Sequence, residues 1–90
     1  MTMVFCYDIA DHRTRRRVAA HLEERAVRVQ ESVFEARLSE REASHLFESV
    51  RRLLNPEDSL RMYALSATGL SRSRSAGGAP LPEDGDFWLV

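Results

Sequence analysis

The chain has 90 residues, of which 43% are hydrophobic and 30% charged, and this length supports a single globular domain over residues 1–90. All thirteen basic residues are arginines, balanced by fourteen acidic residues, so the net charge of -1 by itself indicates no class of partner. No apolar run is long enough to cross a bilayer, the apolar run before Asp8 is too short for a signal peptide, and Cys6 has no second cysteine. We therefore expect a soluble, cytoplasmic protein with no membrane role.

Residues 3–9 are nearly continuous in apolar, β-prone side chains, which is typical of a central strand covered on both faces. Asp8 is the exception within this run. A helix is predicted from about residue 12 to 25, because Asp11 is a favourable N-cap residue. The apolar positions of this helix form a narrow stripe of Val18, Ala19 and Leu22.

Residues 27–38 are predicted to form a second strand. Its apolar residues move from odd to even positions, first Val27, Val29 and Val33, then Phe34, Ala36 and Leu38. Such a change indicates a β-bulge or a strand covered on both faces.

A second helix is predicted to begin after Ser39, because Ser39 to Glu42 has the sequence of a capping box. Apolar residues then recur every three or four positions until Asn55-Pro56 ends the helix. Residues 59–66 alternate as a half-buried strand does. Residues 67–85 are predicted to be a loop with at most a short strand at 70–76, and residues 87–90 to form a last strand.

This order of elements predicts an α+β, ferredoxin-like split βαβ fold, with an antiparallel-containing sheet and both helices on one face. The other face then lacks a cover, although the sheet carries Phe5, Tyr7 and Phe34. We therefore expect a symmetric homodimer that pairs the sheets, in which the C-terminal strand could cross to the partner. A monomer with a modest exposed patch is the alternative.

The densest charge in the chain, His12 to Arg17, opens the first predicted helix. Positive charge is unfavourable at a helix N-terminus, so the cluster indicates function, and arginines beside helix N–H groups suit phosphate. Arg15 and Arg17 are the predicted phosphate contacts, while Arg13 and Arg16 should project mostly outward. The alternative is a solvated charged turn, relieved by nearby carboxylates.

Asp8 is the second candidate site residue, because a carboxylate in an apolar strand is unfavourable unless it is paired or bound to a cation. Arg15 lies on the inward face of its helix and should point toward Asp8, so an ion pair with Arg15 is one explanation. A twofold axis that brings Asp8 beside its copy is another, because Mg²⁺ is commonly held by one or two carboxylates and water.

The segment 28–35 is predicted to place Arg28, Gln30, Ser32 and Phe34 on one strand face. Polar groups interleaved with an aromatic ring can bind nucleic acid through phosphate contacts and base stacking. The same face can equally line a dimer interface, and for Phe34 both interpretations stay open.

Together, Tyr7-Asp8-Ile9, the arginines at 15–17 and the segment 28–35 resemble the small CRISPR-associated Cas-two family, which partners the spacer integrase. The similarity is close over residues 3–38 and looser over 58–65. The resemblance implies a ferredoxin-like homodimer that helps to capture foreign DNA fragments as new spacers, with the CRISPR integrase and nucleic acid as partners. Some members of the family are described as metal-dependent endonucleases acting on RNA or DNA.

By position, the resemblance implies that Asp8 is a catalytic metal ligand near the dimer axis. It implies that the remaining matched residues serve activity or binding: Tyr7 as a catalytic residue, and Arg15, Arg17, Arg28 and Phe34 as contacts to nucleic acid. Ala26 departs from the glycine that the family usually has before the second strand, which raises the question of whether that turn is altered.

The leading interpretation is a protein of CRISPR adaptation, in antiviral defence. Its paired Asp8 residues would hold Mg²⁺ for phosphodiester hydrolysis, and its arginines would hold the nucleic-acid backbone. A non-catalytic scaffold of the integrase complex and a toxin-like small ribonuclease that acts without an integrase are the alternatives.

Overall fold

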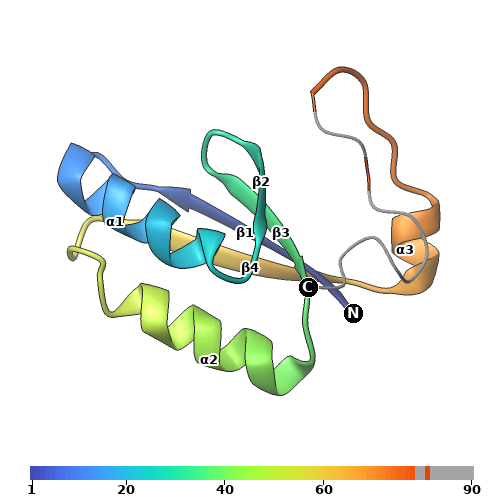
Figure 1. Cartoon of the computed structure of the whole chain (residues 1–90), viewed down its shortest axis with the longest axis horizontal. Helices are drawn as coiled ribbons and strands as arrows, with labels where there is room; N and C mark the ends of the chain where they lie inside the picture. The colour runs from blue at the N-terminus through green and yellow to red at the C-terminus, as the bar shows by residue number, and fades with distance from the viewer. Residues whose placement is uncertain (79–80, 82–90) are drawn as a thin grey trace.

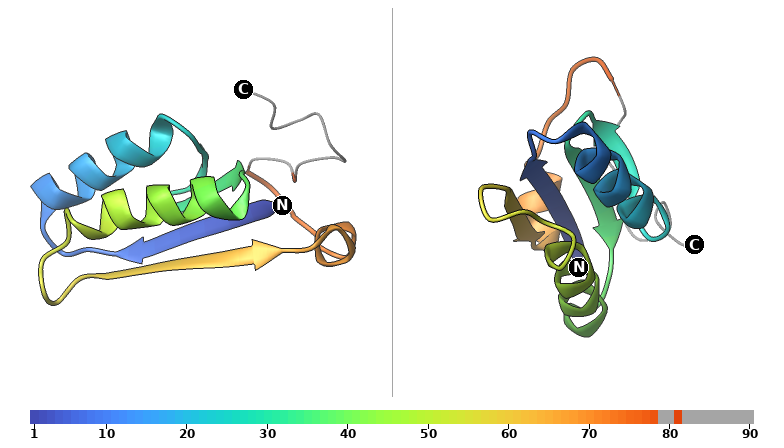
Figure 2. Two further views of the ribbon diagram at one scale, coloured as in Figure 1. Left: turned by 90° about the horizontal axis from the view of Figure 1, so that it is seen from below. Right: turned by 90° about the vertical axis from the view of Figure 1, so that its left-hand side faces the viewer.

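The computed structural model describes residues 1–78 and residue 81. The elements follow one another in the order β1 (Thr2–Asp8), α1 (His12–Glu23), β2 (Val27–Gln30), β3 (Val33–Arg37), α2 (Glu40–Arg51), β4 (Ser59–Leu65) and α3 (Ala67–Ser71). The four strands form one antiparallel sheet in the order β2-β3-β1-β4. Both long helices lie on the same face of this sheet (Figure 1 and Figure 2). The predicted ferredoxin-like α+β fold is therefore confirmed.

Strand β1 is the central strand, because it pairs with β3 on one side and β4 on the other. Its alternate residues Met3, Phe5 and Tyr7 are buried beneath the helices. The residues between them face the other way, where Val4 and Cys6 are half-buried. The central position is as predicted, but the helices cover only one face of the strand.

The three aromatic residues that seemed to require a partner chain are in fact buried within one chain. Phe5 pairs with Phe34 across β1 and β3, and both side chains are fully buried on the helix-covered face. Tyr7 lies on that face as well. These rings therefore give no reason to expect a partner chain over the other face. The helix-free face carries smaller apolar side chains, with Tyr63 of β4 exposed among them.

Residues 27–38 form a hairpin and not a single strand. β2 and β3 are antiparallel neighbours, and the chain reverses between them at Glu31 and Ser32. The change in apolar parity arises because apolar residues lie on both faces: Val33 pairs with Cys6 on the helix-free face, whereas Phe34 is buried on the covered face. The register between Arg28 and Gln30 is also irregular, so the expected bulge is present.

Both long helices begin where the sequence predicts. Asp11 caps α1 by accepting a hydrogen bond from the Thr14 backbone N–H, and the predicted apolar stripe of α1 is buried. At α2, Ser39 and Glu42 form the full capping box. Helix α2 ends at Arg51, which leaves Asn55 in the loop that leads to β4.

After β4 the chain turns into the short helix α3, where the sequence suggested a loop with at most a strand at 70–76. Ser66 caps this helix through the Gly69 backbone N–H. The predicted strand at 87–90, and its exchange between copies, lie outside the described residues. Within the described part no residue other than glycine has a positive φ, so Ala26 enters β2 without backbone strain. No described helix has both the length and the apolar character needed to span a membrane.

Candidate functional site

The two predicted catalytic residues, Tyr7 and Asp8, lie on opposite faces of the sheet. Successive side chains of a strand alternate between its two faces, and Tyr7 takes the helix-covered one. Asp8, the last residue of β1, is exposed and pairs through its backbone register with Ser59 of β4. One chain therefore cannot bring both side chains to the same reacting group.

The Asp8 carboxylate makes no side-chain hydrogen bond or ion pair with the described residues. The expectation of a buried carboxylate paired with Arg15 is wrong on both points. Because Asp8 is exposed, its charge keeps its hydration and needs no partner within the chain.

Tyr7 is held on the covered face, with only 7% of its surface exposed. Its ring stacks on Phe34, with 6.3 Å between the ring centroids and 26° between the planes. Its hydroxyl donates to the backbone carbonyl of Glu31 at 3.4 Å. Burial raises the pKa of Tyr7, although nearby Arg28 opposes the rise. The hydroxyl therefore stays protonated at neutral pH and is available as a hydrogen-bond donor.

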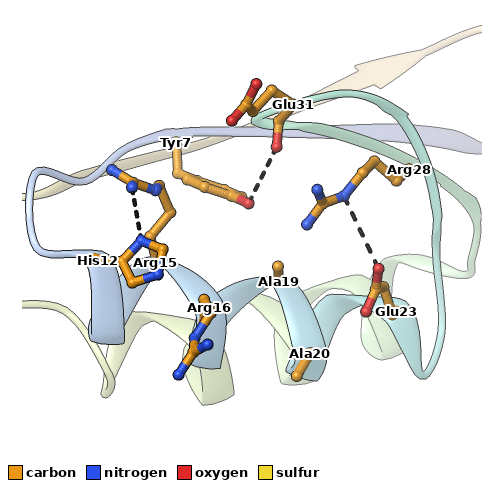
Figure 3. Close-up of a pocket in the computed structure, with 9 residues that line it drawn as sticks. All are labelled: Tyr7, His12, Arg15, Arg16, Ala19, Ala20, Glu23, Arg28 and Glu31. Carbon is orange, nitrogen blue, oxygen red and sulfur yellow. Dashed lines mark hydrogen bonds and ion pairs between the residues drawn. The ribbon is translucent and has the colours of Figure 1, made fainter.

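A pocket of about 370 Å³ opens between α1 and the β2–β3 hairpin, and Tyr7 is one of its walls (Figure 3). Arg28 enters it from β2, with its Nε 3.9 Å from the Glu23 carboxylate. Both partners of this ion pair are about half exposed, so it holds Arg28 only loosely. The pocket is lined by Tyr7, His12, Arg15, Arg16, Ala19, Ala20, Glu23, Arg28 and Glu31.

Phe34 is a core residue and does not reach the surface. It is fully buried, its ring is stacked on Tyr7, and the Arg28 guanidinium carbon lies 5.1 Å from the ring centroid. It therefore cannot stack on a base or line an interface in this conformation, and both predictions for Phe34 are wrong. Its aromatic side chain instead supports Tyr7 and Arg28 from below.

Arg15 points to the end of β1, as predicted, but its partners differ from the expected carboxylate. Its Nη1 donates to the carbonyl oxygen of Ile9 at 3.1 Å and lies 3.5 Å from that of Ala10. Its Nη2 is 3.1 Å from Nδ1 of His12, which must accept because a guanidinium can only donate. Arg15 thus binds the backbone of the turn that follows Asp8.

The other arginines of α1 are exposed, as expected for Arg13 and Arg16. Arg17 does not line the pocket, whereas Arg16 does. Figure 3 shows the Arg16 guanidinium directed away from Tyr7, so Arg16 belongs to the rim. The helical period would have located Arg16, because Ala19, Ala20 and Glu23, three, four and seven residues further on, line the same side.

A hydrogen-bonded chain that sequence reasoning missed ties the start of α1 to the loop before β4. The Asn55 side-chain amide donates to Thr14 Oγ1 at 3.3 Å, and Thr14 Oγ1 donates to Asp11 Oδ2 at 2.9 Å. The Thr14 backbone N–H also donates to Asp11 Oδ2, and these bonds lower the pKa of Asp11. Nothing in the sequence marks Asn55 except its place before Pro56.

The residues present fit a metal ion best if two chains share it. Among the described residues no three His, Cys, Asp or Glu side chains are gathered so as to hold a metal. Asp8 offers one exposed carboxylate per chain, and Mg²⁺ requires one or two carboxylates with water completing its shell. A second copy of Asp8 would supply what one chain lacks.

Comparison with known proteins supports the resemblance seen in the sequence. The family model of CRISPR associated protein Cas2 matches residues 1–72. A protein of Synechocystis named CRISPR-associated endoribonuclease Cas2 2 is 39% identical over 87 residues, which cover 94% of each chain.

Two solved structures share the fold. Streptococcus pyogenes Cas2 superposes with a TM-score of 0.74 at 25% identity, covering 86% of this chain and 100% of that one. A chain of a partial Cas6-RT-Cas1–Cas2 complex superposes with a TM-score of 0.78 over 94% of both chains. Its identity is 23%, so this second likeness concerns the fold alone.

Proposed function

This chain belongs to the Cas2 family of CRISPR-associated proteins, and from that membership we propose that it acts as a homodimer in CRISPR adaptation. In this role it binds nucleic acid, pairs with the CRISPR integrase and hydrolyses phosphodiester bonds with Mg²⁺. The relative named an endoribonuclease supports the cleavage, and the related fold within a complex that contains Cas1 supports the integrase partner.

The observation that carries this proposal is the exposed carboxylate of Asp8 at the end of the central strand. It lies at the edge of the face that the helices leave open, so a second copy facing that side can bring its own Asp8 nearby. The two carboxylates would then hold one Mg²⁺. When bound, the ion would polarise the phosphodiester and activate water.

The chain's own part in the reaction is to orient the nucleic acid and to neutralise its charge. Arg17 is exposed on α1 and has no ion pair with the described residues, so its guanidinium is available to a phosphate. Arg28 is held only loosely by Glu23 and can exchange that carboxylate for a phosphate. Tyr7 lies on the other side of the sheet from Asp8, so it serves the pocket and not the metal.

A non-catalytic scaffold is the second candidate function. The observation that favours it is the same scarcity of ligands, because the described residues hold no complete metal-binding group. A scaffold would keep the exposed arginines and the dimer while Asp8 carried no reaction.

Cleavage assays separate the two functions. Single-stranded RNA and duplex DNA are incubated with and without Mg²⁺, with the wild type, with Asp8→Asn and with Glu24→Gln. We expect Asp8→Asn to lower the Mg²⁺-dependent rate by about 100-fold, since it keeps the shape of the side chain but removes the ligand charge.

Glu24→Gln is the matched control, because this exposed carboxylate lies at the other end of α1. It should leave the rate unchanged. Equal rates for the wild type and Asp8→Asn would contradict a metal site at Asp8. Nucleic-acid binding without cleavage in the wild type would support the scaffold.

A further inference from the structure

We infer that Arg15 and Asn55 are positioning residues, which hold the turn after β1 from two sides and thereby fix Asp8. The inference rests on the proposed function for its catalytic consequence. Asp8 needs such support because its own carboxylate has no side-chain partner among the described residues. Its position is therefore decided by the backbone on either side of it.

We call the contacts through which Arg15 and Asn55 hold this turn the clamp. Its first half comes from α1. The Arg15 guanidinium reaches back to the two carbonyl groups that follow Asp8, those of Ile9 and Ala10. The Arg15 backbone N–H also donates to the carbonyl of Asp11 at 2.9 Å. That backbone bond is the first i→i−4 bond of α1, so the contact that is specific to Arg15 is made by its side chain.

The second half comes from the loop between α2 and β4, which is 41 residues away in the chain. Asn55 donates to the Thr14 hydroxyl, which in turn donates to the carboxylate of Asp11. The Asn55 amide nitrogen can only donate and the Asp11 carboxylate can only accept, so the Thr14 hydroxyl between them accepts from Asn55 and donates to Asp11. The series connects Asn55 to the N-cap of α1, at the end of the same turn.

Asn55 is itself anchored next to the strand that pairs with Asp8. Its backbone N–H donates to Asp58 Oδ2 at 2.8 Å, and the Asp58 N–H donates back to the Asn55 carbonyl at 3.0 Å. The next residue, Ser59, is the register partner of Asp8. The clamp therefore connects both strand ends that border the Asp8 carboxylate.

This geometry gives Arg15 a different role from the phosphate contact that the sequence predicts. Its Nη1 is directed at backbone carbonyls and its Nη2 at His12. Figure 3 shows its guanidinium turned toward the β1–α1 turn, while that of Arg28 is turned toward Tyr7. A phosphate contact by Arg15 would have to use the N–H groups that its bonds to the turn and to His12 leave over.

The test uses the full chain with Arg15→Lys, Arg15→Ala, Asn55→Ala and the control Arg41→Ala. Arg41 is an exposed arginine of α2 and takes no part in the turn or the pocket. Lysine keeps the positive charge of Arg15 but loses the planar fork that reaches several acceptors at once. Thermal melting confirms that each variant is folded.

The first measurement is hydrogen exchange of the Thr14 and Arg15 amides, without metal or nucleic acid. We expect about tenfold faster exchange in all three turn variants, since each loosens the turn locally. In RNA cleavage we expect a lower kcat at an unchanged KM. The salt dependence of RNA affinity should stay the same, because no phosphate contact is lost.

The opposite pattern would overturn the inference. If Arg15→Lys matches the wild type in every measurement while Arg15→Ala lowers the salt slope by about 0.7 to 0.9, Arg15 is a phosphate contact. If exchange in the variants equals that of Arg41→Ala, the clamp is absent. A wild type that does not cleave RNA contradicts the proposed function, and with it the catalytic role of the clamp. Unchanged hydrogen exchange in the variants, when the wild type does cleave RNA, contradicts the clamp alone.

Discussion

At the scale of single residues, the buried and exposed members of the predicted site behave differently. Phe34 supports Tyr7 by stacking and lies beneath the Arg28 guanidinium, so changes at Phe34 disturb the pocket without touching a ligand. Asp8, in contrast, is exposed, and its side chain makes no hydrogen bond or ion pair within the described part of the chain. A loss of function has a different physical cause at each position.

Replacing Phe34 with alanine should destabilise the protein by about 3–5 kcal/mol, because it empties a fully buried aromatic site. Urea denaturation of the wild type and Phe34→Ala measures this difference. Val27→Ala is the control, since Val27 is an exposed apolar residue of the neighbouring strand and should change stability much less. A stable Phe34→Ala protein that has lost RNA binding would instead favour base stacking by Phe34.

Site prediction from the sequence succeeded where a residue type and its spacing carry the information. The inward direction of Arg15 follows from its spacing to Val18 and Leu22, and Arg15 does reach the end of β1. Its carbonyl partners were not predictable, because every residue has a backbone carbonyl and none is marked in the sequence. Asn55 was missed for the same reason, since its contact with Thr14 depends on how two distant loops meet.

At the scale of elements, helices with capping signals were predicted well and the hairpin was not. Ser39 to Glu42 specifies the start of α2 through local hydrogen bonds, so no tertiary information is needed. The turn at Glu31 and Ser32 lacks the glycine or asparagine that usually marks a tight hairpin. The reversal therefore left no local signal in the sequence, and the change in apolar parity reflects side chains on both faces of β3.

The capping box at α2 makes stability depend on pH. Hydrogen bonding, chiefly from the Ser39 backbone N–H, lowers the pKa of Glu42 below its ordinary value of 4.5. The folded state therefore favours the charged form, and this contribution is complete above pH 4.5 and is lost as the pH falls through the folded-state pKa. We expect Glu42→Gln to be less stable than the wild type at neutral pH and to approach it on acidification.

Thermal melting as a function of pH provides the measurement, and Glu24→Gln is again the control because no hydrogen bond or ion pair holds the Glu24 side chain within the described part of the chain. A stability difference between the wild type and Glu42→Gln that stays constant with pH would show that the Glu42 charge does not contribute.

At the scale of the whole molecule, the sheet has one face covered by two helices and one face that they leave open (Figure 2). On the open face Val4 of β1 is the register partner of Tyr63 of β4, and Tyr63 is 48% exposed. Half-buried Cys6 and Leu65 lie on the same face. This set of apolar side chains, in place of the buried rings, is the surface through which we propose that two chains pair.

Charged substitutions on the open face should therefore separate the dimer. We expect Val4→Lys and Tyr63→Glu to sediment as monomers at concentrations at which the wild type is dimeric, since each adds a charge to the surface that two chains would bury. Ser44→Lys, on the exposed side of α2, should remain dimeric. Tyr63 is exposed, so its variant should fold normally, and a dimeric Tyr63→Glu protein would contradict pairing through this face.

The isolation of Asp8 at the rim of the open face also has a consequence for dosage. If each metal site takes one Asp8 carboxylate from each of two chains, a dimer is active only when both chains carry Asp8. The active fraction of dimers is then the square of the fraction of wild-type chains. Mixing equal amounts of wild type and Asp8→Asn, with exchange of subunits, should leave about a quarter of the dimers intact at both copies. An inactive copy present in the same cell would thus suppress its active counterpart, and a residual rate near one half would instead indicate that each chain works alone.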